Sequence, residues 1–213
     1  MCYSFRSSIL AFSIAMLTIF FMYMRQTKID KFLAPLIFTY GFMQLAEAFM
    51  WYDIKCGKIN KIGTYLAYYA LVFPVLATGI GIYLIEKRIL GIIIGLLFFV
   101  YFSITMPKMK CSKPMTKGYP HILWGFNYYR TSLSWPIISF LILFFTKINK
   151  TYKFLLLFWM IITYSYFYVK QIGIKKLFLL YYDTSETSIG TKWCHFASIS
   201  APLLYLIQNF IKP

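Results

Sequence analysis

The chain has 213 residues, of which 60% are hydrophobic and only 13% are charged, about half the charged share of an average soluble domain. Its 22 lysines and arginines outnumber six acidic residues and give a net charge of +16. The basic residues stand in short clusters between apolar runs, and no nucleic-acid-binding motif accompanies them. The charge therefore indicates the loops of a membrane protein and argues against a nucleic-acid partner.

Apolar segments near the length of a bilayer-spanning helix, about 20 residues, recur along the whole chain. The sequence predicts an all-α fold, a polytopic membrane helix bundle in a single transmembrane domain, 1–213, with about seven transmembrane helices and the lipid bilayer as its partner. The predicted spans are 8–24, 32–51, 62–85, 89–105, 131–146, 152–171 and 189–211. The fifth is short and contains Pro136, so six spans with a re-entrant fifth segment are the alternative.

The connection between the fourth and fifth predicted spans is long and rich in aromatic residues. It contains Pro107, Pro114 and Pro120, followed by an aromatic stretch from His121 to Tyr129. Prolines disfavour a helix, and Trp and Tyr are typical of headgroup depth. We expect a loop that lies on the membrane surface.

Basic residues indicate an orientation for this integral, multi-pass chain. They are concentrated in the short first, third and fifth loops, and short cytoplasmic loops carry an excess of Lys and Arg. We therefore expect an extracytosolic amino terminus and a cytosolic carboxyl terminus.

Seven spans would bring all the cysteines and histidines to one side of the membrane. Four cysteines there allow two disulfides in an oxidising compartment, and we favour Cys2 with Cys194 because both flank membrane helices at the same depth. In the cytosol the same thiols could bind zinc or iron, or carry palmitate. Because no C-x-x-C or H-x-x-x-H pair occurs, the sequence predicts no metal site and no cofactor. The residues concerned are Cys2, Cys56, Cys111, Cys194, His121 and His195.

The second predicted span carries a polar stripe. Tyr40, Gln44, Glu47 and Trp51 are spaced four, three and four residues apart, which places them on one face of a helix. An ionisable group inside a span costs roughly 2.5 kcal/mol or more unless it faces protein or water. The predicted ligand- or ion-binding residues are Glu47, Gln44, Trp51, His195 and Tyr68. An alternative of equal weight is that Glu47 forms an interhelical hydrogen bond that stabilises the bundle.

Three short motifs resemble those of a family of uncharacterised small multispan membrane proteins. They are the Met-Cys-Tyr-Ser start, the Gly41-x-x-Gln44-x-x-Glu47-x-x-x-Trp51 run and the Trp193-Cys194 pair. The family begins Met-Cys-Phe-Ser, and this chain departs from its Gln-Gln-x-x-Glu-Gly-x-x-Trp run at Met43 and Ala48. The resemblance implies that Cys2, Glu47 and Cys194 form one cluster, and it implies no activity.

These features lead to one main functional hypothesis and two alternatives. The main hypothesis is a membrane protein that binds or conducts a small ion or apolar ligand at a pocket near Glu47. The alternatives are an intramembrane enzyme acting on lipid through His195, Glu47 or a thiol, and a structural or assembly protein. No nucleophile–base–oxyanion arrangement can be identified from spacing, which leaves enzymatic activity undecided.

Overall fold

The computed structural model is mostly helical and describes residues 4–115, 121–126, 129–144, 146–147, 150, 153–154, 162 and 189–207. Its helices are α1 (Phe5–Arg25), α2 (Lys28–Tyr52), α3 (Lys58–Glu86), α4 (Leu90–Ile104), α5 (Tyr129–Phe144), α8 (Ile189–Ile199) and α9 (Ala201–Ile207). Two three-residue strands, β1 (Lys113–Met115) and β2 (His121–Leu123), form an antiparallel hairpin. The helical content fits the predicted all-α fold.

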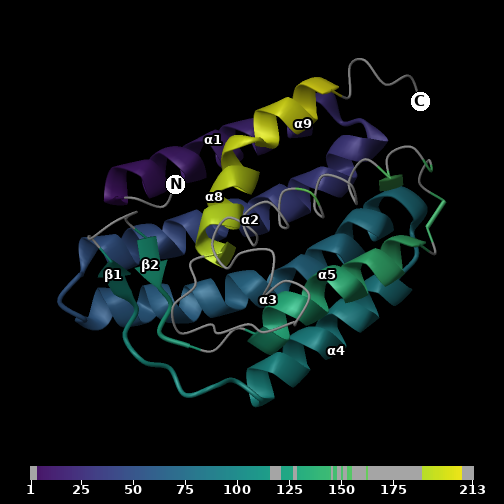
Figure 1. The fold of residues 1–213 in the computed structure, drawn as a ribbon. Coiled ribbons are helices and arrows are strands. Elements are labelled where there is room, and N and C mark those ends of the chain that lie inside the picture. Colours follow the sequence, from purple (N-terminus) through teal and green to yellow (C-terminus); the bar gives the residue numbers. More distant parts are fainter. Residues whose placement is uncertain are drawn as a thin grey trace.

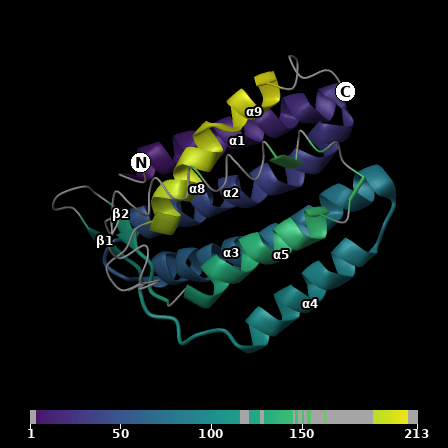
Figure 2. The same cartoon turned by 45° about the vertical axis from the view of Figure 1, so that its right-hand side comes forward.

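The helices pack side by side around α2 and α3 (Figures 1 and 2). Helix α2 packs between α1 and α3, and both α4 and α5 pack on α3. Helix α8 lies against α1 and α2, and α9 continues along α1. The start of α1, the α2–α3 turn, the β-hairpin and the start of α8 share one end of the bundle, which we call the hairpin end.

Three helices are long and apolar enough to cross a membrane, and they correspond to the first three predicted spans. They are α1, α2 and α3, with 21, 25 and 29 residues. Helix α4 is apolar but has only 15 residues. Large apolar side chains are exposed on the outer faces of the bundle, including Leu17, Phe20, Phe38, Leu97, Val100 and Ile104. This surface is compatible with contact to lipid.

The count of seven helices is only partly tested by this structure. Most of the predicted sixth span, 152–171, lies outside the described residues. The predicted seventh span is divided into α8 and α9, with Ser200 between them and Pro202 at the second position of α9. Proline lacks a backbone N–H and is tolerated in the first turn of a helix, so it favours a new start there.

Glycines let α3 and α4 approach until their backbones touch. A Cβ atom added at Gly79 would lie 2.2 Å from the carbonyl oxygen of Gly91. A Cβ atom at Gly95 would lie 2.5 Å from the Cα of Leu76, one turn away along the same interface. Small residues at such crossings are typical of helix pairs in membranes, where close van der Waals packing drives association.

At the end of the bundle opposite the hairpin, Arg25 joins three elements. Its guanidinium donates two hydrogen bonds to the buried Asp30 carboxylate, at 2.8 and 2.7 Å. It also donates to the backbone oxygen of Tyr205 at 3.1 Å and stacks over that ring at 3.8 Å from its centroid. Asp30 in turn caps the start of α2 together with Thr27. This contact fixes α9 to the α1–α2 turn.

The segment between α4 and α5 differs from the surface loop that we expected. Strands β1 and β2 pair with Pro114 opposite Ile122, and the side chains of Ile122, Trp124 and Phe126 are buried. Alternate residues of an extended segment point to the same face, so these three apolar side chains can pack inward together. The aromatic side chains described in this segment, Trp124 and Phe126, therefore pack into the core of the bundle.

Candidate functional site

The polar stripe of α2 forms a hydrogen bond inside the bundle. Gln44 and Glu47 are both fully buried. The side-chain amide of Gln44 donates from Nε2 to Oε2 of Glu47 at 3.1 Å. Helical geometry brings residues three apart to the same face, so this contact follows directly from the sequence. Burial makes the contact significant, because a polar group removed from water without a partner costs free energy.

Helix α8 adds a histidine to this pair. The Nδ1 atom of His195 lies 2.8 Å from Oε1 of Gln44, and the His195 side chain is 4% exposed. Since Gln44 gives its N–H to Glu47, its oxygen faces His195 and can only accept, so Nδ1 carries the proton. In a neutral ring Nε2 is then an acceptor. We call Glu47, Gln44 and His195 the polar cluster; it joins residues 151 positions apart.

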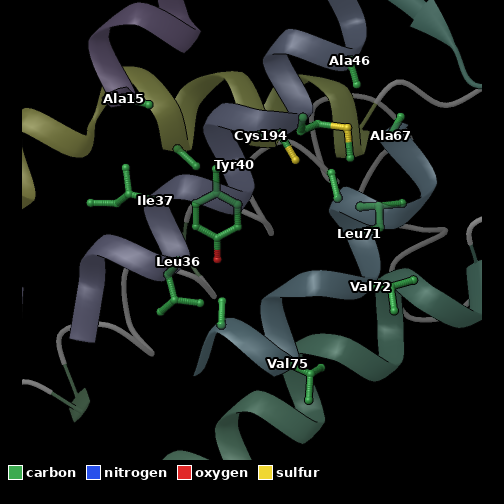
Figure 3. Close-up of a cluster of buried hydrophobic side chains, with 14 of the residues drawn as sticks. Ala15, Leu36, Ile37, Tyr40, Ala46, Ala67, Leu71, Val72, Val75 and Cys194 are labelled. Atoms are coloured by element: carbon green, nitrogen blue, oxygen red, sulfur yellow. The ribbon is translucent and has the colours of Figure 1, made fainter. Parts of the chain in front are cut away.

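Apolar side chains surround Tyr40, the first residue of the polar stripe of α2. Figure 3 shows Tyr40 among Leu36, Ile37 and side chains of α3, with the sulfur of Cys194 from α8 nearby. The side chain of Cys194 is buried. Cys2 lies outside the described residues, so its pairing with Cys194 stays a prediction.

The two remaining predicted ligand residues lie in different surroundings. Trp51 continues the stripe one turn beyond Glu47, partly buried against the core. Tyr68 is fully buried in α3, but its hydroxyl donates to the backbone oxygen of Phe102 at 2.7 Å. Its ring packs against Phe126 with centroids 5.4 Å apart. Tyr68 thus links α3 to the end of α4 and to the hairpin segment.

A disulfide connects the hairpin segment to the α2–α3 turn. Cys56 and Cys111 stand at disulfide distance, with their Cα atoms 5.6 Å apart. The expectation of at least one disulfide is met by this pair. His121 lies in β2, close to this region, and its side chain is not described.

Asn60 holds the same region together and was not identified from the sequence. Its Nδ2 donates to the backbone oxygen of Ser112 at 2.9 Å, and its Oδ1 accepts from the Ser112 backbone N–H at 3.1 Å. The Ser112 hydroxyl bonds to Thr64 at 2.8 Å and accepts from the Gly125 N–H at 2.9 Å. No signal in the sequence marks these residues, because an asparagine in the first turn of a helix is ordinary.

Within the described part of the chain, no three His, Cys, Asp or Glu side chains gather in a group that could hold a metal ion. The arrangement offers instead a carboxylate, an amide and an imidazole in series. Groups of this kind can bind a proton, a small cation or a polar ligand.

Comparison of the chain with protein-family models, with curated proteins and with solved structures gives no match. The functional argument therefore depends on the chain's own residues and on the geometry of the polar cluster.

Proposed function

We propose that the chain is a multi-pass integral membrane protein that binds or conducts a small polar ligand or ion at the polar cluster. The observation that carries the proposal is the complete burial of Glu47 in α2, a helix long and apolar enough to span a membrane. Ionisable residues inside membrane spans are costly and commonly serve substrate binding, ion passage or proton transfer.

Glu47 carries an ionisable group where a neutral side chain could accept the same hydrogen bond from Gln44. The Gln44–His195 hydrogen bond joins α2 to α8 and stabilises their packing. Gln or Asn at position 47 could accept the hydrogen bond from Gln44 without the desolvation cost of a carboxylate. The carboxylate at this position therefore favours a ligand-binding or proton-binding role.

The proposal includes seven spans and an orientation. Helices α1 to α5, one span in the 152–171 segment, and α8 with α9 give this number. Disulfides persist in oxidising compartments, so the Cys56–Cys111 pair supports an extracytosolic hairpin end and amino terminus. Exposed basic residues of the described structure occur at both ends, so the disulfide carries more weight than the charge. They are Arg6, Lys55, Lys58, Lys61, Lys108, Lys110 and Lys113 at the hairpin end, and Lys28, Lys87, Arg88, Lys147 and Lys150 at the other.

Flux measurements in liposomes test the function. Glu47→Gln keeps the size of the side chain and an acceptor for Gln44, and it removes the ionisable group. We expect the variant to lose proton or monovalent-cation flux to the level of empty liposomes. Glu86→Gln is the matched control, since it makes the same chemical change at the far end of α3. Equal flux in wild type, Glu47→Gln and empty liposomes, together with no Glu47-dependent ligand binding, would exclude the proposal.

Accessibility of the cysteines tests the orientation. In intact cells treated with reductant, a membrane-impermeant maleimide should label Cys56 and Cys111 from outside. Labelling only after permeabilisation would place the hairpin end in the cytosol.

A further inference from the structure

Two buried polar atoms in α1 and α2 have no hydrogen-bond partner among the described residues. They are the hydroxyl oxygen of Ser8 and the indole Nε1 of Trp51. The Ser8 side chain is completely buried. Nearly all buried polar atoms in proteins have a partner, and the exceptions commonly mark an ordered water molecule or a ligand.

The register of α1 against α2 places Ser8 at the level of Glu47. The rings of Phe5 and Tyr52 lie 6.0 Å apart at one end of this helix pair. Farther along, a Cβ atom added at Gly41 would lie 2.9 Å from the Cβ of Ala15. Because the two helices are antiparallel, Ser8 is level with Ala48, the neighbour of Glu47.

Helix α8 is the third helix at the level of Ser8 and Glu47. It packs against both α1 and α2 and brings His195 to Gln44. Ser8 belongs to the buried face of α1 that continues through Ala11 and Ala15. Ser8, Glu47 and His195 therefore line one junction between three helices, which we call the α1–α2–α8 junction. Trp51 lies at the edge of this junction, one helical turn beyond Glu47 in α2.

The chemistry of these groups selects one kind of ligand. As a carboxylate, Glu47 accepts hydrogen bonds, and neutral His195 accepts at Nε2. Trp51 can only donate, and Ser8 can do both. A bound cation would leave the Trp51 N–H without a partner, and an anion is repelled by the Glu47 carboxylate. The hydroxyl group of a ligand can form hydrogen bonds with these side chains. Its hydrogen is donated to Glu47 or His195, and its oxygen accepts from the Trp51 N–H.

We propose that the α1–α2–α8 junction binds a hydroxyl group, with the acceptors of the polar cluster on one side and the Trp51 N–H and Ser8 hydroxyl on the other. The inference rests on the proposed function, because it names the class of ligand held at the polar cluster. Water and an alcohol dissolved in the bilayer share this chemistry, and the experiment separates them.

Infrared difference spectra of the purified full chain in phosphatidylcholine nanodiscs test the inference, since this lipid carries no hydroxyl of its own. We expect an O–H stretching band in wild type that is absent from the Ser8→Ala/Trp51→Phe variant. A shift of this band in H₂¹⁸O identifies water. A band that appears only after addition of 1-decanol, and does not shift in H₂¹⁸O, identifies an alcohol. Either result supports the proposal. A variant-sensitive band that neither shifts in H₂¹⁸O nor requires 1-decanol is that of the Ser8 hydroxyl itself, and this result, like the absence of any variant-sensitive band, overturns the proposal.

Thr18→Val is the matched control, because its buried hydroxyl already donates to the Ile14 carbonyl oxygen of its own helix. This variant should keep the band. Resonance Raman spectra of the wild-type protein, with those of Trp51→Phe subtracted, keep the test valid if the double variant fails to fold. A Trp51 N–H that is free of hydrogen bonds overturns the proposal. The readout does not depend on flux, so a band without flux would contradict ion conduction and leave the hydroxyl site standing.

Discussion

Substitution of Gly79 by alanine should destabilise the bundle far more than the same change at Gly91, although the two glycines face each other. A Cβ atom at Gly79 would lie 2.2 and 2.3 Å from the carbonyl oxygen and carbon of Gly91 and 2.7 Å from the nitrogen of Ile92. All three are backbone atoms of α4 and cannot rotate away. Helices α3 and α4 must then separate by roughly 1 Å to restore ordinary contact.

The geometry on the opposite side is much looser. A Cβ atom at Gly91 would meet the Cα of Gly79 at 3.0 Å and the Cγ2 of Ile142 at 3.4 Å. A movement of a few tenths of an ångström relieves this contact. Gly→Ala also contributes up to about 1 kcal/mol of helix propensity at either position. The Gly91 variant should therefore remain within about 1 kcal/mol of wild type, whereas overpacking at Gly79 costs about 1–3 kcal/mol and lost contacts add to it.

Steric trapping in detergent micelles, which yields a free energy of unfolding, measures the difference. We expect Gly79→Ala to be less stable than Gly91→Ala by about 2 kcal/mol. Equal stabilities of the two variants would refute the reasoning, because a symmetric result means that α3 and α4 do not touch backbone to backbone at this point.

Three further predictions concern the ends of the bundle. Arg25→Ala should cost about 1.5–3 kcal/mol, because the buried Asp30 carboxylate loses its charge-assisted hydrogen bonds from Arg25 and keeps those from the Thr27 N–H and hydroxyl. The losses of Arg25→Ala and Asp30→Ala should not add in the Arg25→Ala/Asp30→Ala double variant, and additive losses in this double-mutant cycle would contradict the pairing. Asp53→Ala should cost about 0.5–2 kcal/mol, measured in the same way, because this carboxylate accepts from two backbone N–H groups in the first turn of α3; an unchanged free energy of unfolding would speak against the cap. Reduction of the Cys56–Cys111 disulfide, which spans 55 positions of the sequence, should lower the free energy of unfolding by about 2–4 kcal/mol. The free energy of unfolding of a Cys56→Ala/Cys111→Ala variant should not respond to reductant. A wild-type free energy of unfolding that reductant does not change would argue against the disulfide.

The first three spans could be predicted because hydrophobic length alone determines them. Helices α1, α2 and α3 extend each predicted span by only a few residues at either end, where polar capping residues are used. The Gln44–Glu47 contact was also accessible, since it depends only on helical spacing. Its partner His195 was proposed for the same site, but the contact through Nδ1 depends on how α8 packs against α2.

The hairpin segment could not be predicted by the rules that we applied. Prolines and aromatic residues indicated a surface loop, and the alternate spacing of Ile122, Trp124 and Phe126 was the overlooked signal for an extended segment with one buried face. The Cys56–Cys111 pairing could not be predicted for the same reason. Cys56 and Cys111 meet only because this segment folds back over the α2–α3 turn, and four cysteines alone allow three pairings.

The Arg25 contact at the far end of the bundle bears on His195. Tyr205, which Arg25 holds by a hydrogen bond and by stacking, lies in α9, directly after the helix that carries His195. Together α8 and α9 form an arm that is attached to α2 at one end by an imidazole and to the α1–α2 turn at the other by a guanidinium. A rotation or slide of this arm has to break one attachment or strain the other. The environment of Glu47 is thus mechanically coupled to the opposite end of the bundle, and a change in the Arg25 attachment should alter the geometry of the polar cluster without touching it.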